Sequence, residues 1–465
     1  MRTLLKAVKW VAGLVVAALV ILCLWLYAAP PALIRVAAGY TAKIVCSNVF
    51  VAGRDAQDVL ATDVQAPGHP VLRLMSAEVD SEKATVSAGL FGLFGGGLAV
   101  ARDNGGCATV PDGNVAAAKV FSQEPPAEGI DPHSLWPRGE RVEPSQNQIV
   151  NTILDDAGGT GPGMRAVVVI KDGRIVGERY GDGFSPSTPL LGWSMTKTVN
   201  AAIIGALMKA HKMSLEATAL FDAWKDDDRA KISLADLMAM SSGLEFNEDY
   251  GAVADVTRML YLEPDMAGFA EAKPLAGEIG KVWSYSSGTA VMLSRLWQNA
   301  VGNRAVALAW PRTALFDPLG MTSAVMETDA RGTFVGSSYL YATAHDWARF
   351  AQFLIDDGVW NGVRLLPEGF VSWMREPAPA SHGRYGRGQL WLVGPKEDVP
   401  GREEGGFDLP SDTFWMLGHD GQSIAIVPSQ RLAVIRLGLT PDSLGYRPQA
   451  MVAALVKALE TEIDR

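Results

Sequence analysis

The sequence predicts an α+β protein in which segments far apart in the chain form one antiparallel sheet. Residues 165–180 hold two β-rich runs around an Asp-Gly turn, which is typical of a hairpin. Residues 424–437 hold two more strand-like runs, and the segment from about 200 to 375 follows a mostly helical pattern. Strands at both ends with helices between them indicate one sheet closed by distant segments.

The length of 465 residues suggests two or three domains with ample material for a core. Hydrophobic residues make up 48% of the chain and charged residues 20%, as in globular proteins. The formal net charge is −10, and no run rich in lysine or arginine occurs. These features exclude nucleic acid as a partner.

Residues 1–29 are predicted to be a transmembrane anchor. Three basic residues precede an uncharged segment from Trp10 to Ala29, and about 20 such residues span a bilayer as a helix. The basic flank favours the cytoplasm, so we expect a single-pass protein of the bacterial inner membrane with its catalytic domain on the periplasmic side. A cleaved signal peptide is the alternative, although Tyr27-Ala28-Ala29 is a poor cleavage site.

Residues 35–120 are predicted to form a small exported module of mixed character. The runs 71–74 and 84–87 have strand composition, and the glycine-rich run 89–97 is expected to be a loop because it lacks the spacing of a dinucleotide-binding motif. A proline-rich stretch, 121–144, is predicted to be a linker. A last amphipathic helix is expected from Met451 to about Ile463.

Three cysteines occur in the chain, and Cys23 lies inside the apolar segment. This leaves Cys46 and Cys107 as an even pair on the exported side. In an oxidising compartment the pair predicts a disulfide that closes a loop of about 60 residues. Two buried free thiols are the alternative.

A serine stands three residues before a lysine, Ser194 and Lys197, at the start of an apolar helical run. Positions i and i+3 share one face of a helix, so the hydroxyl and the amine can meet. A partly desolvated lysine can remove the proton of a serine, and the helix N-terminus supplies free N–H groups. A capping serine with a solvated lysine is the alternative, because a four-residue motif occurs by chance about once in such a chain.

Two further motifs follow in order: Tyr285-Ser286-Ser287 before a helical run, and His419-Asp420-Gly421 before two strand-like runs. Together with Ser194-x-x-Lys197 they resemble the serine β-lactamase and penicillin-binding-protein superfamily. The likeness is greatest to its class C-like esterase and amidase branch, which includes 6-aminohexanoate-dimer hydrolases. It covers residues 145–465 and implies a β-lactamase-like serine hydrolase domain, an antiparallel sheet flanked by helices plus an all-helical subdomain.

The resemblance implies a role for each residue. Ser194 would attack a carbonyl carbon and form an acyl-enzyme, with Lys197 as the base. Tyr285 would relay the proton to the leaving group, its phenol pKa lowered by the nearby lysine charge. The backbone N–H groups of Ser194 and Gln422 would form the oxyanion hole.

The resemblance also places Ser287, His419 and Gly421 at the substrate. Lactam-hydrolysing relatives usually have asparagine at the position of Ser287 and lysine at that of His419, which is mostly neutral at pH 7. A site with less positive charge binds a substrate carboxylate less well. Esters or small amides therefore fit better than β-lactams or D-Ala-D-Ala peptides. Neither a metal nor an organic cofactor is expected.

Other readings remain open from the sequence. A lipase-type nucleophile elbow lacks its second glycine here, so a Ser-His-Asp hydrolase that uses His419 or His345 is a distant alternative. The six histidines are scattered without metal-ligand spacing. The remaining alternatives are a β-lactamase or D-Ala-D-Ala carboxypeptidase, and a catalytically weak or inactive penicillin-binding-protein-like sensor of cell-wall peptides.

Overall fold

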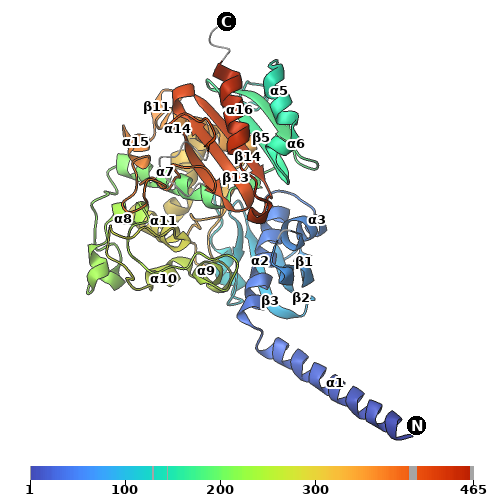
Figure 1. Cartoon of the computed structure of the whole chain (residues 1–465). Helices are drawn as coiled ribbons and strands as arrows, with labels where there is room; N and C mark the ends of the chain where they lie inside the picture. The colour runs from blue at the N-terminus through green and yellow to red at the C-terminus, as the bar shows by residue number, and fades with distance from the viewer. Residues whose placement is uncertain (1, 67, 128–129, 144, 397–405, 461–465) are drawn as a thin grey trace.

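The computed structural model of the protein describes residues 2–66, 68–127, 130–143, 145–396 and 406–460. Its centre is a five-stranded antiparallel sheet in the order β12-β13-β14-β5-β6 (Figure 1). The strands are β5 (Met164–Lys171), β6 (Arg174–Tyr180), β12 (Phe414–Gly418), β13 (Gln422–Val427) and β14 (Leu432–Gly438). Strand β14 pairs with β5, so the predicted sheet of distant segments is confirmed.

Helices cover both faces of this sheet. Side chains alternate along β5, so Val167 and Val169 pack with α5 (Gln148–Asp155) and α16 (Gln449–Glu460) on one face. Val168 and Ile170 belong to the main core on the other face, where α14 (Ala344–Ile355) crosses β5 and β14. The predicted C-terminal helix is present to Glu460, and its expected residues 461–463 lie outside the described part.

The segment between the strands is mostly helical, as predicted. Helix α11 packs against α7, α8, α10 and α12. The bounds are α7 (Thr196–Lys209), α8 (Leu234–Met238), α9 (Asp255–Leu262), α10 (Met266–Glu271), α11 (Ser287–Val301) and α12 (Arg304–Pro311). Three short strands, β7 (Leu190–Leu191), β9 (Leu340–Ala342) and β8 (Val325–Met326), form a small sheet beside the start of α7.

The N-terminal segment folds as a helix, α2 (Ala32–Phe50), laid on a four-stranded sheet. The strands are β1 (Met75–Asp80), β2 (Thr85–Leu90), β3 (Phe94–Arg102) and β4 (Gly106–Thr109). Two local predictions were wrong. The run 71–74 belongs to a 3-10 turn, because a proline starts it and the His69 side chain accepts a hydrogen bond from Val71 N–H. The glycine-rich run ends in β3. This strand lies so close to α2 that a Cβ on Gly97 would be 2.1 Å from the Ala38 carbonyl oxygen.

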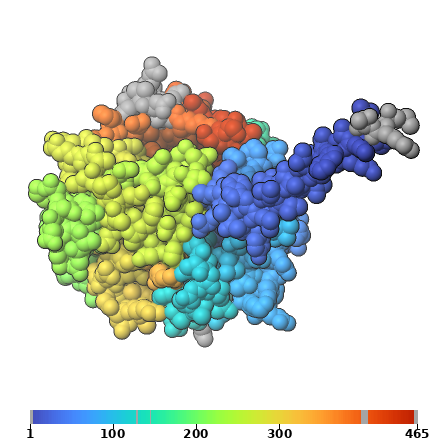
Figure 2. All heavy atoms as spheres, turned by 90° about the horizontal axis from the view of Figure 1, so that it is seen from below, coloured from blue at the N-terminus to red at the C-terminus, as the bar shows by residue number. Residues whose placement is uncertain are grey.

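Covalent and ionic contacts hold this module in place. Cys46 of α2 and Cys107 of β4 form the expected disulfide. Lys43 of α2 makes a buried ion pair with Glu327, whose carboxylate also accepts bonds from the Ser47 hydroxyl at 2.8 Å and the Cys107 N–H at 2.6 Å. Figure 2 shows the module, blue to cyan, packed directly against the helical region.

Helix α1 (Arg2–Ala28) projects away from the body (Figures 1 and 2). Its segment Leu4–Ala28 has a mean hydropathy of 2.6 and is exposed along its length. A helix of this length and composition can cross a membrane, and a signal sequence meets the same description. The described residues of the expected linker, 121–144, form neither helix nor strand apart from a bridge between Leu135 and Arg141.

Candidate active site

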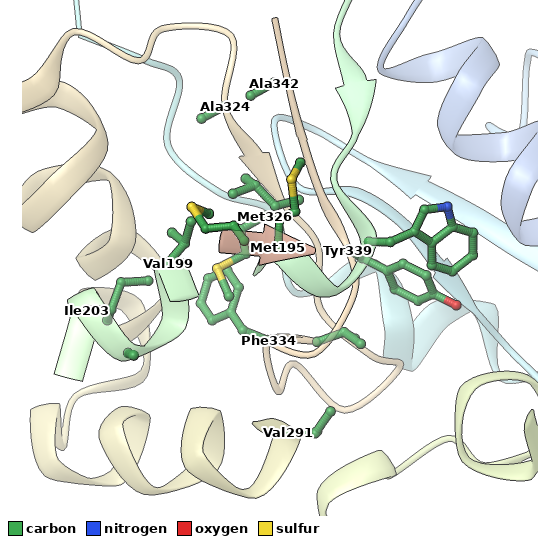
Figure 3. Packing of buried hydrophobic residues seen from close by; sticks show 14 of the residues in the cluster. Met195, Val199, Ile203, Val291, Ala324, Met326, Phe334, Tyr339 and Ala342 are labelled. Atoms are coloured by element: carbon green, nitrogen blue, oxygen red, sulfur yellow. The ribbon is translucent and has the colours of Figure 1, made fainter. Parts of the chain in front are cut away.

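Ser194 lies in a 3-10 turn, Trp193–Met195, that leads into α7. Met195 and Val199 point into a hydrophobic cluster with Met326 and Phe334 (Figure 3). The Ser194 residue is only partly buried. Trp193 has a φ of 48°, a conformation that is unfavourable for a bulky residue. The apolar cluster therefore fixes the turn that holds the serine.

Lys197 is buried one turn behind the serine. Its ammonium lies 3.1 Å from Ser194 Oγ, 3.1 Å from Ser287 Oγ and 3.0 Å from the Ser337 carbonyl oxygen. Burial lowers the pKa of Lys197 to about 8, against the opposing charge of Glu248. A neutral amine is therefore accessible near neutral pH, directly beside the serine hydroxyl.

Glu248 is a site residue that the sequence analysis missed. Its carboxylate accepts a bond from the Ser287 N–H at 2.8 Å and another from the Ser287 hydroxyl. A chain of polar contacts thus runs from Ser194 through Lys197 and Ser287 to Glu248. Burial raises the pKa of Glu248, and the Lys197 charge opposes that shift. No sequence motif singled out this loop glutamate.

Ser287 therefore lies between two ionisable groups, Lys197 and Glu248. It is fully buried at the first residue of α11, where it accepts a bond from Lys197 and donates one to Glu248. Its expected role in substrate binding stays a prediction, and these contacts also let it position the lysine.

Tyr285 is brought close to Ser194, which acts on the pKa of its phenol. The ammonium of Lys197 lies 4.6 Å above its ring centroid. The expected lowering of its phenol pKa is wrong: burial raises the pKa well above 10, and the neighbouring Tyr385 and Glu248 add to the shift. The phenol is therefore a proton donor at neutral pH.

The His419 ring lines the mouth of the site. It lies 5.4 Å from the Trp193 ring, edge to face, and stacks at 5.0 Å on Tyr250. Tyr250 was not anticipated from the sequence. Burial and the Glu248 charge raise the pKa of its phenol well above 10 while Ser287 opposes that shift, so Tyr250 lies close to both residues.

The free edge of β12 faces this site. Trp415 of β12 exchanges two backbone hydrogen bonds of 2.8 Å with Trp391, whose ring lies 5.4 Å from the Tyr285 ring. Backbone groups of a strand alternate in direction, so the N–H of His419 falls on the same edge as that of Trp415. Gly418, with φ −127° and ψ 162°, is extended and keeps this alternation to the end of the strand.

The same register directs the Gln422 N–H away from the serine. Gln422 pairs with Gly418 across the β12–β13 ladder, and its side-chain amide bonds the His419 carbonyl oxygen at 3.1 Å. The backbone of Gly421 has a φ of 82°, and a Cβ at this position would point toward the Arg436 side chain. The glycine that approaches the turn holding Ser194 is Gly418, where a Cβ would lie 2.3 Å from the Gly192 carbonyl oxygen.

His345 lies elsewhere, in α14. Its two ring nitrogens bond Glu140 at 2.9 Å and Glu178 at 2.8 Å, and these carboxylates raise its pKa to about 9 against the effect of burial. It therefore links the linker segment to the sheet and does not act on Ser194. Within the described residues, no three His, Cys, Asp or Glu side chains are grouped so that they could bind a metal ion.

Comparison with solved structures shows the same fold in several proteins. A candidate 6-aminohexanoate-dimer hydrolase of Bacillus anthracis aligns with a TM-score of 0.54 and 22% identity, over 73% of this chain and 88% of its own. A penicillin-binding-protein homologue of Caulobacter crescentus aligns at 0.51 and 16%, over 68% and 99%. A family VIII carboxylesterase aligns at 0.50 and 16%, over 69% and 98%.

Sequence comparison is consistent with this likeness. An uncharacterized protein of Alkalihalophilus pseudofirmus is 29% identical over 101 residues, which is 21% of this chain and 29% of that relative's length. The Beta-lactamase family model matches residues 153–455 and thus contains all three motifs and the whole five-stranded sheet. The chain therefore belongs to the β-lactamase family, whose members are serine hydrolases.

Proposed function

We propose that the protein is a membrane-anchored, extracytoplasmic serine hydrolase that cleaves an ester or small amide through an acyl-enzyme on Ser194. The observation that carries the proposal is the 3.1 Å contact between Lys197 Nζ and Ser194 Oγ. Because the pKa of Lys197 is about 8, this amine can accept the serine proton near neutral pH.

The reaction follows from the positions of three groups. Lys197 takes the hydroxyl proton as Ser194 Oγ attacks the carbonyl carbon. Tyr285, protonated and close to Ser194, gives a proton to the leaving alcohol or amine as the bond between that group and the carbonyl carbon breaks. Lys197 then returns its proton to the tyrosine. Water, deprotonated by the same groups, releases the acyl group and restores the serine.

We propose the backbone N–H groups of Ser194 and His419 as the oxyanion hole, with His419 in place of Gln422. Both N–H groups lie where the nucleophile turn meets the free edge of β12, whereas the Gln422 N–H faces the β12–β13 ladder. Such donors stabilise the negative charge that develops on the substrate oxygen.

The charges around the site favour neutral substrates. Where lactam-hydrolysing relatives usually carry a lysine, His419 is held between two aromatic rings. The Asp420 carboxylate lies 3.4 Å from the His419 ring and the Glu248 carboxylate bonds Ser287, and both repel a substrate carboxylate. Esters and small amides therefore fit better than β-lactams or peptides that end in a carboxylate.

Two features support an extracytoplasmic location. The Cys46–Cys107 disulfide is typical of oxidising compartments. The exposed apolar helix α1 follows a basic N-terminal flank, which favours an orientation with the body outside the cytoplasm.

The proposed function is tested with the full chain in detergent and two variants, Ser194→Ala and, as a matched control, Ser187→Ala. Each protein is incubated with p-nitrophenyl acetate and with a fluorophosphonate, and hydrolysis and intact mass are followed. We expect turnover and a single adduct in the wild type and in Ser187→Ala, and neither in Ser194→Ala. Activity that survives in Ser194→Ala would show that the reaction occurs at another centre.

A further inference from the structure

A cavity of about 270 Å³ lies between the N-terminal module and the catalytic domain. This volume is close to the lower end of small-molecule pockets, about 300–1,000 Å³. One wall is the first turns of α2, with Leu33, Val36 and Ala37. The opposite wall includes Tyr250 and the exposed Ala252.

The inner end of the cavity adjoins the candidate active site, although Ser194, Lys197 and Tyr285 are not among the described residues that line it. Trp193, the residue before the nucleophile, lines it together with His419. Tyr250, also in the lining, lies close to Ser287, which in turn contacts Lys197. An acyl group attached to Ser194 therefore has this cavity beside it.

The outer end of the cavity lies at the root of the apolar helix. Helix α1 ends at Ala28 and α2 begins at Ala32, so the connecting residues span at most about 14 Å. Leu33, in the first turn of α2, is 36% exposed and lines the cavity. When α1 lies in a bilayer, this turn is held at the membrane surface. Figures 1 and 2 show that α1 projects from the body next to the N-terminal end of α2.

The chemistry of the lining fits an apolar chain. Among the described residues that line the cavity there is no lysine or arginine, and most side chains are aliphatic or aromatic. Such a surface gives no cation for a phosphate or carboxylate, but it buries methylene groups favourably.

We propose that this cavity binds the acyl chain of a membrane lipid ester and presents its carbonyl carbon to Ser194. The proposal rests on the proposed function and names its substrate class. Ser194 Oγ forms a bond to the carbonyl carbon, the ester C–O bond breaks, and the lipid alcohol leaves with a proton. Water then releases the fatty acid.

The first experiment measures chain-length selectivity with the full chain in one detergent. We expect kcat/KM for p-nitrophenyl decanoate to exceed that for the acetate by about tenfold or more, because the added methylenes are buried. Ala252→Trp and Leu33→Trp fill the cavity from opposite walls, so each should lower the decanoate-to-acetate ratio at least about fivefold. Ala272→Trp changes an exposed alanine outside the cavity and should keep the wild-type ratio.

The second experiment tests the membrane as the source of the ester. The protein is reconstituted in vesicles of phosphatidylethanolamine and phosphatidylglycerol, and fatty acid release is measured for the wild type, Ala252→Trp and Ser194→Ala. We expect release by the wild type, less by Ala252→Trp and none by Ser194→Ala. Hydrolysis of soluble decanoate without release from vesicles would overturn the membrane source.

The outcomes separate the two proposals. Acetate hydrolysis that depends on Ser194 but shows no preference for longer chains overturns the cavity proposal and leaves the proposed function standing. If Ala252→Trp and Leu33→Trp both leave the decanoate-to-acetate ratio of kcat/KM unchanged, the cavity proposal is also overturned and the proposed function stands. Absence of any hydrolysis that depends on Ser194 overturns both.

Discussion

At the residue scale, the site depends on how the proton affinity of one amine is set. Lys197 is buried, which favours its neutral form, while Glu248 across Ser287 favours the charged form. The balance leaves a pKa of about 8, low enough for a base at neutral pH and high enough to return the proton.

This balance predicts a pH profile. kcat/KM for p-nitrophenyl acetate should rise with pH and level off above about 8, because only neutral Lys197 accepts the serine proton. Glu248→Gln removes the charge that raises the lysine pKa, so the inflection should move to lower pH by about one unit. The exposed Glu245→Gln, in the same loop, should leave the profile unchanged. An inflection that stays in place in Glu248→Gln would show that Glu248 does not act on the lysine.

At the element scale, two contacts join segments that are far apart in the sequence. One depends on a glycine that has no side chain, and the other on polar side chains of α14. The end of β12 approaches the nucleophile turn because Gly418 has no side chain. The linker segment is held to α14 and β6 by His345, which bonds Glu140 and Glu178, and by Arg349, which bonds the carbonyl oxygens of residues 137 and 139.

Gly418→Ala tests the first contact. The backbone at Gly418 is an ordinary extended one, so alanine introduces only a steric conflict, with its Cβ 2.3 Å from the Gly192 carbonyl oxygen. Moving β12 away by part of an ångström should lower kcat/KM by roughly a hundredfold. Gly158→Ala, where the nearest atom is the flexible Asp156 side chain at 3.2 Å, is the control. Full activity in Gly418→Ala would place the oxyanion donors elsewhere.

His345→Gln tests the second contact through the pH dependence of stability. The folded-state pKa of about 9 lies above the ordinary 6.5, so the stabilisation is fully present below pH 6.5 and is lost as pH rises through 9. The free energy of unfolding, measured in urea, should be clearly larger for the wild type than for His345→Gln at about pH 6. This difference in free energy should shrink by about pH 9.5. The exposed His133→Gln is the control. A difference that does not change with pH would mean that the histidine stays neutral.

At the scale of the whole molecule, the N-terminal module is part of the catalytic body. Glu327, next to the core strand β8, is buried and bonds Lys43, Ser47 and the Cys107 N–H of the module. The disulfide holds Cys46 and Cys107 together, so the partners of Glu327 come from one rigid unit. The cavity wall contributed by α2 is fixed by the same contacts.

Lys43→Met should therefore lower the free energy of unfolding by about 3–5 kcal/mol, because it leaves the Glu327 carboxylate buried without a cation. Thermal or urea unfolding measures the change. Lys83→Met breaks an exposed ion pair with Asp80 and should have no measurable effect. Equal stability of Lys43→Met and the wild type would show that the ion pair contributes nothing to the docking of the module.

The sequence by itself determined what depends on short-range spacing. Ser194 and Lys197 meet because i and i+3 share a helix face, and β5 and β6 pair because an Asp-Gly turn joins two β-rich runs. The disulfide could be anticipated because the chain offers one pair of cysteines outside the apolar helix. That distant segments share one sheet also followed from strand-like runs at both ends of the domain with helices between them, whereas the pairing of β14 with β5 came from the structure.

Only the tertiary structure decided what depends on burial and on contacts between distant segments. Glu248 reaches Ser287 from a loop without a motif, and the pKa of Tyr285 is raised because packing removes water from its hydroxyl. Gln422 faces the ladder because strand register fixes the direction of each N–H, which a motif of residue types does not encode. The cavity beside Ser194 exists because α2 packs against the mouth of the site. Spacing along the chain is a local property, whereas solvation and register are set by the fold as a whole.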